Sequence, residues 1–333
     1  MTAIDGFLDA VVKAGVPGVV ALFAGPGGSW EKAAGLADVE TGSRLTVAHR
    51  FPIASVTKTF VATVVLQLAG EGVVDLDRPA PGLDATVRQL LNHTSGLPDA
   101  YSMQESIAQR RRRTPAEMAA VVLGKPRLFA PGDGWSYSGS NYLMLGLLIE
   151  DITGSTLRQE LARRIFEPLG LRASDLPDEP PGDLARGYLP ADNPVVPGPG
   201  PGLVDVTDVV PGVFAGGGMV STAADVARFL RGLLGGELLP PELRAELLQT
   251  VASDWDESDA YGLGIEDIST IGAEASPCGR AWGHLGFMLG HTTIALSSES
   301  GDRQGVMLAT THPLTEETQN AMARLAWACF CAA

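Results

Sequence analysis

A serine and a lysine three residues apart, Ser55 and Lys58, are the first residues whose types and spacing suit catalysis. The apolar residues of the run 56–68 recur at helical spacing until Gly70, so Ser55 is expected at the N-terminus of a helix. Free backbone N–H groups and the helix dipole favour negative charge there. Lys58 lies one turn further on, and a desolvated lysine can take the proton of a serine hydroxyl. A motif this short also arises by chance, so other segments have to support it.

Two further segments hold candidate residues. Tyr137 lies in the sequence WSYSGSNY, and His284 lies in WGHLGF. A single buried tyrosine or histidine usually serves packing, but beside the Ser-Lys pair we favour a catalytic role for both. No Gly-x-Ser-x-Gly sequence occurs, which argues against an α/β-hydrolase even though Ser95 follows a histidine. The other histidines considered are expected to be structural or to lie in a loop, namely His93, His291 and His312.

The composition of the chain excludes several classes of partner. Its net charge of −15 opposes binding to nucleic acids or anionic membranes, because both reward basic surfaces. The basic run 110–113 is expected to be a solvated helix face. No apolar stretch is long enough to span a membrane. No cluster has metal-binding spacing and no glycine loop has a phosphate-binding pattern, so we expect no metal and no cofactor.

Cysteine usage and the N-terminal residues bear on the compartment. Cys278, Cys329 and Cys331 form an odd set without framework spacing, which predicts reduced thiols. The first residues have neither a basic region nor a long apolar region, so they lack the pattern of a signal peptide. We therefore expect a cytoplasmic protein, and no feature of the sequence indicates its oligomeric state.

The order of the expected elements indicates one sheet built from both ends of the chain around a helical middle. We expect an α+β fold in which 1–65 and 245–333 form one subdomain and 66–244 forms a mainly helical second one. Nine prolines between 177 and 213 indicate a long ordered loop or lid within the helical part. The patterns predict strands at 18–24, 30–36, 261–265, 284–298 and 305–310, and helices at 4–14, 115–123, 141–153, 155–166, 222–234 (capped by Thr222) and 315–329.

Taken together, these motifs resemble those of the serine β-lactamase and D,D-peptidase superfamily, in the branch of class C β-lactamases, D,D-carboxypeptidases and related esterases. In that family Ser-x-x-Lys supplies the nucleophile and its base, Tyr-x-Asn supplies a second proton-handling group, and Lys-Thr-Gly or His-x-Gly lies on the edge strand. The resemblance implies an antiparallel sheet flanked by helices, a mainly helical subdomain, and an active site in the cleft between them. It covers nearly the whole chain and includes LLNHTSGLPD at 90–99, FAPG at 129–132, GGGMVSTAADVARFL at 216–230 and YGLG at 261–264.

The resemblance implies a role for each candidate residue. Ser55 would be the nucleophile and Lys58 its proton acceptor, while Tyr137, with its pKa lowered by Lys58, would relay the proton to the leaving group. His284 would lie across the cleft. The backbone N–H groups of Ser55 and Phe287 would form the oxyanion hole. The substrate site would be lined by Trp135, Gly139, Asn141 and Gly286, the last because substrate backbone has to approach this strand closely.

The chain departs from the family pattern at Gly139, where the family usually has an asparagine. That amide normally helps to hold the lysine and the substrate carbonyl, and Asn141 is at most a partial substitute. We therefore expect an acyl-transfer enzyme, an esterase, amidase or transacylase, that forms a Ser55 acyl-enzyme with a small ester or amide. A D,D-peptidase or β-lactamase proper is one alternative. A catalytically idle binding protein on the same fold is the other, although Ser55, Lys58 and Tyr137 are all present.

Overall fold

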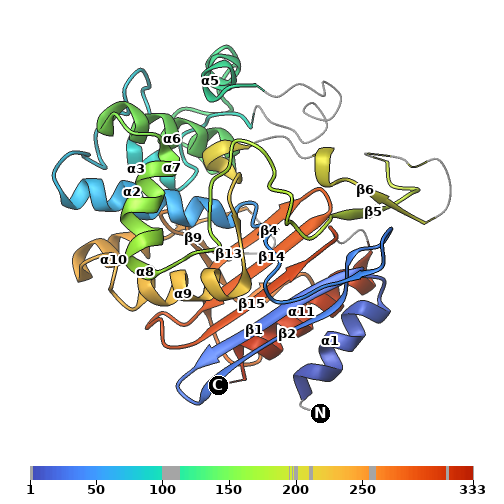
Figure 1. Cartoon of the computed structure of the whole chain (residues 1–333). Coiled ribbons are helices and arrows are strands. Elements are labelled where there is room, and N and C mark those ends of the chain that lie inside the picture. The colour runs from blue at the N-terminus through green and yellow to red at the C-terminus, as the bar shows by residue number, and fades with distance from the viewer. Residues whose placement is uncertain are drawn as a thin grey trace.

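The computed structural model describes residues 3–99, 113–194, 196, 198, 202–209, 213–254, 260–312 and 315–332. Its centre is a nine-stranded antiparallel sheet with the order β3-β2-β1-β15-β14-β13-β10-β9-β8. The first three strands pair with the last ones, so the predicted sheet from both chain ends is confirmed (Figure 1). The strands are β1 (Gly18–Gly25), β2 (Gly28–Asp38), β3 (Ser43–Arg44), β8 (Val251–Ala252), β9 (Ala260–Tyr261), β10 (Glu266–Ile268), β13 (Ala281–Met288), β14 (His291–Ser297) and β15 (Gln304–Ala309).

Helices cover both faces of the sheet, as the expected α+β fold requires (Figure 1). Successive side chains of a strand point to opposite faces, so Val20 packs in one core and Val19 in the other. Helices α1 (Ala3–Lys13) and α11 (Glu316–Phe330) close the core of Val19. Helices α2 (Val56–Gly70) and α9 (Ala223–Leu234) close the core of Val20.

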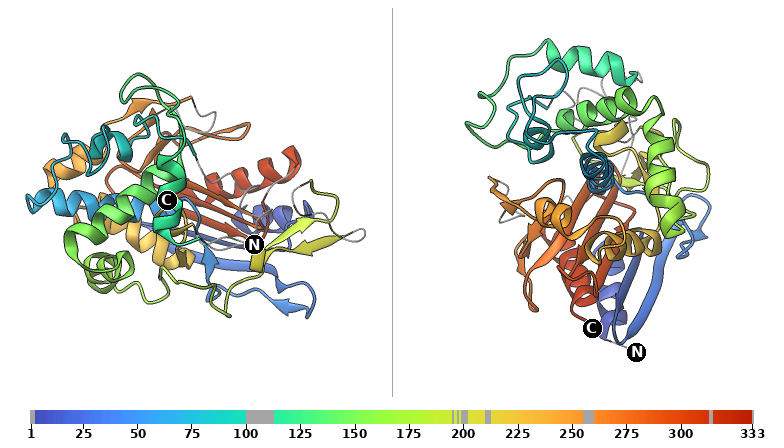
Figure 2. Two further views of the ribbon diagram at one scale, coloured as in Figure 1. Left: turned by 90° about the horizontal axis from the view of Figure 1, so that it is seen from above. Right: turned by 90° about the vertical axis from the view of Figure 1, so that its left-hand side faces the viewer.

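The core that contains Val20 continues into the helical part of the chain, which lies on the other side of α2 from the sheet (Figure 2). Its helices begin where the sequence supplies caps, because Thr86, Thr114 and Thr156 each form a capping box. The helix expected at 155–166 is α7 (Leu157–Leu161) followed by a π-helical turn at Ala162–Phe166. The remaining helices are α3 (Val87–Leu91), α5 (Pro115–Leu123), α6 (Gly139–Thr153), α7 (Leu157–Leu161), α8 (Glu167–Leu169) and α10 (Pro241–Leu247). A division of the chain at residues 65 and 245 stays a prediction.

The described part of the proline-rich segment 177–213 contains a small hairpin of β5 (Tyr188–Pro190) and β6 (Leu203–Asp205). Tyr188 also forms an isolated bridge with Thr311, so this segment is tied to the strand end of β15. Short pairs complete the fold: β4 (Phe51–Pro52) with β7 (Val220–Ser221), and β11 (Thr270–Ile271) with β12 (Glu274–Ala275). Two 3₁₀ turns lie at Thr207–Val209 and Phe214–Gly216.

Three sequence expectations differ from the structure. The strand expected at 284–298 is a hairpin, because β13 and β14 are separated by a turn at Leu289 and Gly290. The strand expected at 261–265 ends at Tyr261, and pairing resumes at Glu266. The expectation of reduced thiols is wrong for two cysteines, since Cys278 and Cys331 form a disulfide while Cys329 stays free and buried. Disulfides are typical of oxidising compartments, so the cytoplasmic location loses the support of free thiols and stays a prediction.

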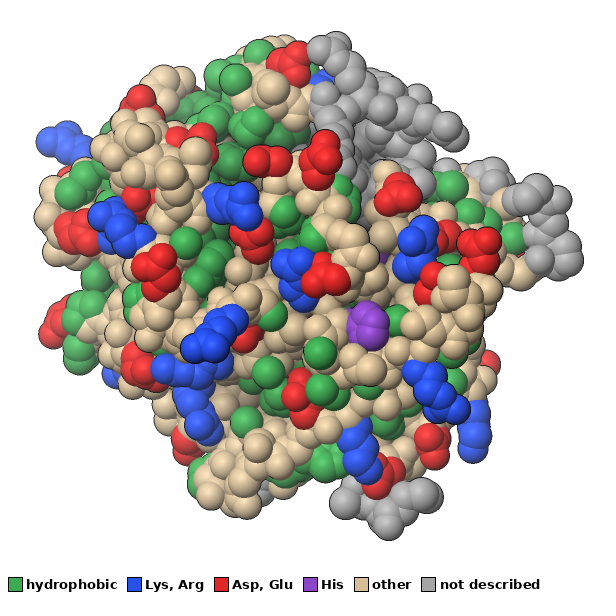
Figure 3. Space-filling view, viewed as in Figure 1, with side chains coloured by type: hydrophobic (Ala, Val, Ile, Leu, Met, Phe, Trp, Pro, Cys, Tyr) green, Lys and Arg blue, Asp and Glu red, His purple; other side chains and the backbone are tan. Residues whose placement is uncertain are grey.

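The surface bears on the expected absence of nucleic-acid and anionic-membrane partners, which stays a prediction. Figure 3 shows acidic and basic side chains intermixed on the face it presents, without a large basic patch. Of the basic run 110–113, all but Arg113 lies outside the described residues. Within the described ranges, no helix has the length and apolar character that crossing a bilayer requires.

Candidate active site

Ser55 lies at the N-terminus of α2, where the sequence placed it. The helix is buried along nearly its whole length, so packing on all sides fixes the position of its first turn. Ala54 just before it has φ 48°, an uncommon left-handed conformation for a non-glycine residue. Such strain concentrates at functional sites. The Ser55 side chain makes no cap bond to its own helix and stays partly exposed, so its hydroxyl is available for a reaction.

Lys58 is buried one turn along, and its Nζ lies 2.9 Å from Ser55 Oγ and 2.5 Å from the carbonyl oxygen of Gly216. Burial lowers the pKa of Lys58 to about 7, although the charges of Asp99 and Glu266 act to raise it. A large share of the amine is therefore neutral near neutral pH. A neutral amine at hydrogen-bond distance from a serine hydroxyl can accept its proton.

The segment that supplies the Gly216 carbonyl packs directly against the nucleophile segment. The backbone N–H of Ile53 donates to Met219 O at 3.0 Å, and the N–H of Met219 donates to Thr57 Oγ1 at 3.2 Å. A Cβ at Gly217 would lie 3.3 Å from the carbonyl carbon of Ala54. The glycine run at 216–218 therefore lets two backbones lie side by side at the base of the site.

Tyr137 precedes α6 and faces Lys58, whose Nζ lies 4.8 Å from the centre of the tyrosine ring. Its hydroxyl oxygen is buried while the residue as a whole is partly exposed. Burial raises the pKa of Tyr137 well above its usual value, and a hydrogen bond with Ser55 opposes this rise. The expectation that Lys58 lowers this pKa is therefore wrong, because desolvation dominates. Tyr137 is a protonated phenol in the resting site, suited to passing a proton on.

The predicted substrate-lining residues near Tyr137 fall in different surroundings. Gly139 opens α6, and a Cβ there would have Asp99 Oδ1 as its nearest neighbour at 3.6 Å, which is ordinary contact. Trp135 is partly exposed, and its ring centre lies 6.0 Å from the ring centre of His93. Asn141 is buried, and its side chain bonds to Ser95 and His93 at 2.5 and 2.9 Å. Asn141 is thus held inside the protein and does not replace the missing amide at Gly139.

His284 lies on β13 with its side chain on the α2 face, but both of its ring nitrogens have partners inside the protein. Nε2 lies 2.9 Å from the Tyr261 hydroxyl. Nδ1 lies 2.7 Å from Leu285 O and 2.8 Å from Glu266 Oε1. The imidazole ring is fully buried, and its centre lies 6.3 Å from the ring centre of Tyr137. The predicted catalytic role of His284 across the cleft stays a prediction. Because both ring nitrogens have protein partners, any effect on the reaction passes through its neighbours.

Gly286 follows on the same face of β13, and its role also differs from the one predicted. A Cβ at Gly286 would lie 2.4 Å from Ile53 O. The close approach that requires glycine is therefore with the protein's own nucleophile segment, not with substrate backbone. This contact brings β13 alongside Ser55, where an oxyanion-hole strand has to lie.

Phe287 is the second proposed oxyanion donor. Met288 pairs with His291 across a two-residue turn, and hydrogen bonds alternate along an antiparallel pair. Phe287, one residue before Met288, is then at a position where its N–H points away from β14. β10 pairs with β13 only from Gly283 downward, so this side of Phe287 is not covered by β10.

Sequence reasoning missed two carboxylates whose charges reach Lys58. Glu266 is buried on β10 at 1% exposure, and Asp99 is exposed at the end of the LLNHTSGLPD stretch beside Gly139. Asp99 is the last residue of the LLNHTSGLPD stretch that carries the family resemblance, so the sequence did offer a signal for it. Glu266 had none, because its place beside His284 depends on the register of β10 against β13. Among the described residues, no group of His, Cys, Asp or Glu could hold a metal ion.

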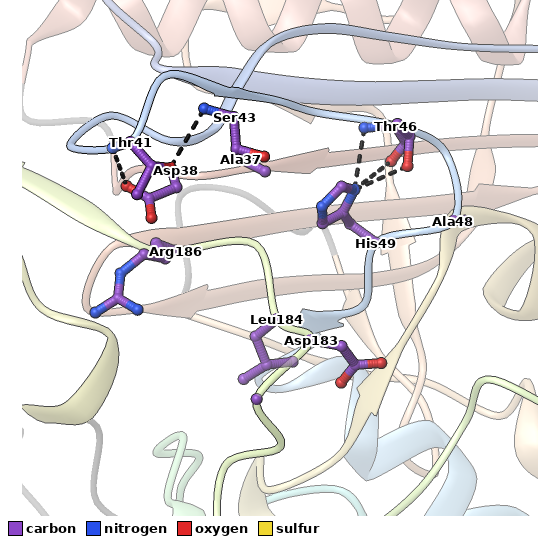
Figure 4. Close-up of a pocket in the computed structure, with 11 residues that line it drawn as sticks. Ala37, Asp38, Thr41, Ser43, Thr46, Ala48, His49, Asp183, Leu184 and Arg186 are labelled. Atoms are coloured by element: carbon purple, nitrogen blue, oxygen red, sulfur yellow. Dashed lines mark hydrogen bonds between the residues drawn. The ribbon is translucent and has the colours of Figure 1, made fainter.

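A separate pocket of about 430 Å³ lies between the β2–β3 region and residues 182–186 (Figure 4). Asp38 there accepts hydrogen bonds from backbone N–H groups, and His49 Nδ1 bonds to Thr46. These side chains are occupied by local turn contacts. The pocket contains none of Ser55, Lys58 or Tyr137, and it offers no comparable reactive pair.

Comparisons with known proteins agree with this geometry. D-aminopeptidase from Brucella anthropi is 36% identical over 177 residues, 48% of this chain and 34% of that protein's length. The match thus spans only about a third of that curated relative. The structure of D-amino acid amidase from Ochrobactrum anthropi SV3, complexed with D-phenylalanine, superposes with a TM-score of 0.86 at 30% identity, over 97% of this chain and 96% of that one. The D-stereospecific amidohydrolase from Streptomyces sp. has a TM-score of 0.82 at 29% identity, over 99% and 98%.

The family model described as Beta-lactamase matches residues 4–327. This range runs from α1 to α11 and so includes every strand of the sheet and the segments that carry Ser55, Lys58 and Tyr137. Since the match extends over nearly the whole chain, the protein belongs to the Beta-lactamase family.

Proposed function

We propose that this protein is a serine amidase that hydrolyses a small amide through an acyl-enzyme on Ser55. The observation that carries the proposal is the 2.9 Å contact between Ser55 Oγ and the buried Lys58 Nζ, whose pKa is lowered to about 7. A buried amine that is partly neutral near pH 7 is the base that an unactivated serine needs.

Acylation begins when neutral Lys58 accepts the hydroxyl proton of Ser55 and Oγ bonds to the substrate carbonyl carbon. The carbonyl oxygen becomes an oxyanion, which the backbone N–H groups of Ser55 and Phe287 stabilise. Collapse of this intermediate breaks the bond from carbon to the leaving nitrogen. Tyr137 donates its proton to that nitrogen and receives the proton held by Lys58, so the pair returns to its starting state.

Deacylation repeats the sequence with water as the nucleophile. Water gives a proton to Lys58 while its oxygen bonds to the acyl carbon. The ester bond to Ser55 then breaks, and Oγ takes the proton back. An amine or alcohol in place of water would make the same site a transacylase. Product analysis distinguishes the two outcomes, because hydrolysis releases a free acid whereas transfer yields a new amide or ester.

The substrate class is an amide of a small amino acid, in the D configuration. Two solved structures that align over most of this chain, at 29% and 30% identity, are named for D-stereospecific hydrolysis and for D-amino acid amides. An amino acid amide carries an ammonium group near neutral pH, and the charges of Asp99 and Glu266 reach the site. Carboxylates beside the nucleophile favour such a cation and disfavour an anionic substrate.

The test combines an active-site label with turnover of matched substrates. We expect a fluorophosphonate to add one adduct to the wild type, mapped by mass spectrometry to Ser55, and none to Ser55→Ala. The exposed Ser29→Ala variant is the matched control and should label fully. We further expect hydrolysis of D-alaninamide to exceed that of L-alaninamide by at least about tenfold, since one misplaced group in a shaped site costs this much.

Three results would contradict the proposal in different ways. Labelling of Ser55 without turnover of any amide or ester would favour a binding protein on this fold. Fast turnover of penicillins or D-alanyl-D-alanine peptides would favour a β-lactamase or D,D-peptidase. An adduct that persists in Ser55→Ala would place the nucleophile elsewhere.

A further inference from the structure

His93 holds the backbone on both sides of Tyr137. Its carbonyl oxygen accepts the N–H of Ser136 at 3.1 Å, and its ring Nδ1 accepts the N–H of Ser138 at 3.2 Å. His93 itself has φ 64°, a left-handed conformation in which non-glycine residues are uncommon. This conformation lets the carbonyl and the ring of one residue reach the two neighbours of the tyrosine. Strain of this kind persists where the surroundings impose it.

The contacts of the ring define its tautomer. Asn141 Nδ2 lies 2.9 Å from the same Nδ1, while Asn141 Oδ1 accepts the hydroxyl of Ser95 at 2.5 Å. A backbone N–H and an amide NH₂ can only donate, so Nδ1 has to accept and carries no proton. The neutral ring therefore has its proton on Nε2, which has no hydrogen-bond partner among the described residues.

The surroundings of His93 keep it neutral. The side chain is fully buried, and burial lowers its pKa well below the usual value, helped by the charges of Lys58 and His284. Aromatic rings pack around it, with the ring centre of Tyr137 at 4.4 Å and that of Tyr261 at 4.7 Å. The groups that face the ring are thus Lys58, His284 and the two tyrosine phenols. A second cation in this space would oppose protonation of Lys58.

We infer that His93 is a positioning residue for proton transfer: it fixes Tyr137 through Ser136 and Ser138 and supports the phenol with a neutral ring. This inference rests on the proposed function, because it assigns the support of the residue that protonates the leaving group. It also gives a role to the histidine of the LLNHTSGLPD stretch. A purely structural histidine would affect stability but would not discriminate between leaving groups.

The test uses two substrates with the same acyl group, D-alaninamide and a D-alanine 4-nitrophenyl ester. An amide nitrogen has to be protonated as it leaves, whereas nitrophenolate leaves without a proton. We expect His93→Ala to lower kcat on the amide by about 100-fold, within the range that general acid catalysis contributes. On the ester we expect a loss below about 10-fold, with KM changed less than threefold on both substrates.

A conservative pair of variants separates positioning from packing. The Oδ1 of asparagine falls near the place of Nδ1, and asparagine tolerates a left-handed backbone. The oxygen of glutamine lies one carbon further out. We expect His93→Asn to retain at least tenfold more amide turnover than His93→Gln. The comparison of the Asn and Gln variants tests the positioning role of His93 even if His93→Ala does not fold.

The control is His291→Asn, at a second buried histidine that bonds to Ala185 O at 2.9 Å outside the site. It should lower the melting temperature and leave the ratio of amide to ester turnover within twofold of wild type. Equal losses on amide and ester in His93→Ala, or equal turnover of the Asn and Gln variants, would overturn the positioning role. A wild type that neither labels at Ser55 nor turns over would overturn the proposed function instead.

Discussion

Lys58 contacts two oxygens, and the two contacts suit the two protonation states of its amine. A neutral amine has two N–H bonds and one lone pair. When one N–H of Lys58 donates to Gly216 O, 2.5 Å from Nζ, the lone pair can face the hydroxyl proton of Ser55. The Ser55 Oγ lies 2.9 Å from the same Nζ. Once protonated, the amine donates to both oxygens. The Gly216 carbonyl therefore orients the base without competing for the proton that it accepts.

The pH dependence of turnover follows from this arrangement. With the pKa of Lys58 lowered to about 7, the neutral base increases as pH rises through 7, so kcat/KM should rise over pH 6–8 and then level off. The midpoint belongs to the coupled Lys58–Tyr137 pair rather than to one residue. We expect Lys58→Arg to lose at least about 1000-fold in kcat, because guanidinium stays protonated. A variant that keeps most of its rate would show that the base lies elsewhere.

Gly139 gives a second test at this scale. A Cβ there meets its nearest neighbour at 3.6 Å, so the start of an asparagine side chain fits. An added amide beside Tyr137 would contact the substrate carbonyl, and we expect Gly139→Asn to raise turnover of amides and β-lactams relative to esters by about tenfold. Gly182→Asn, where no atom lies within 4 Å of a built Cβ, is the matched control. A ratio that Gly139→Asn leaves unmoved would make this glycine a neutral family variant.

The sequence allowed the local parts of the site to be predicted. Ser55 and Lys58 share a helix, so their contact depends only on a spacing of three residues. The partners of His284 could not be predicted, because Tyr261 and Glu266 come from other strands and their position depends on strand register. The pKa of Tyr137 was predicted in the wrong direction, since local charge was visible in the sequence and burial was not.

Among the elements, β13 is held close to the nucleophile segment, because its Gly286 lies directly against Ile53. A Cβ at 2.4 Å from Ile53 O cannot be accommodated by side-chain motion, since the clashing atom belongs to backbone. The sequence predicted a glycine requirement here but not its partner. The pattern shows that backbone approaches closely, and it does not show whether the approaching chain is substrate or protein.

We expect Gly286→Ala to separate β13 from the Ser55 segment and so to displace the Phe287 N–H. Overpacking of this kind costs about 1–3 kcal/mol of the free energy of unfolding. Loss of one oxyanion donor costs about 100-fold in kcat. The melting temperature and kcat should both fall in Gly286→Ala. In the control Gly27→Ala, where no atom lies within 4 Å of the built Cβ, neither should change. Full activity in Gly286→Ala would remove Phe287 from the oxyanion hole.

For the molecule as a whole, the order of the expected elements was sufficient to predict a sheet from both chain ends, and the comparisons confirm the family. The turn between β13 and β14 was missed because the run 284–298 is buried almost throughout, so no exposed polar segment marks the turn. The disulfide was missed because cysteine spacing gives no information about distance in space. Cys278 and Cys331 are 53 residues apart, yet their Cα atoms lie 5.7 Å apart.

This disulfide ties the end of α11 to the segment that leads into β13. In the chain-entropy description, closing a loop of 53 residues stabilises the fold by about 4 kcal/mol. We expect Cys278→Ser to lower the free energy of unfolding by roughly this amount. Dithiothreitol should destabilise the wild type similarly and leave the variant unchanged. Equal unfolding of wild type with and without the reductant would show that the bond contributes nothing to stability.

The pairing of β1 with β15 has a consequence for how the protein is made. Val19 pairs with Ala309, so the ribosome has to add about 290 residues after β1 before this strand gains its second neighbour. At about 5–20 residues per second, this delay lasts tens of seconds. During that time β1 and β2 present an unpaired apolar edge in the cell, where β-strand edges invite association with other chains. Nascent protein should therefore depend on chaperones until β15 has been synthesised.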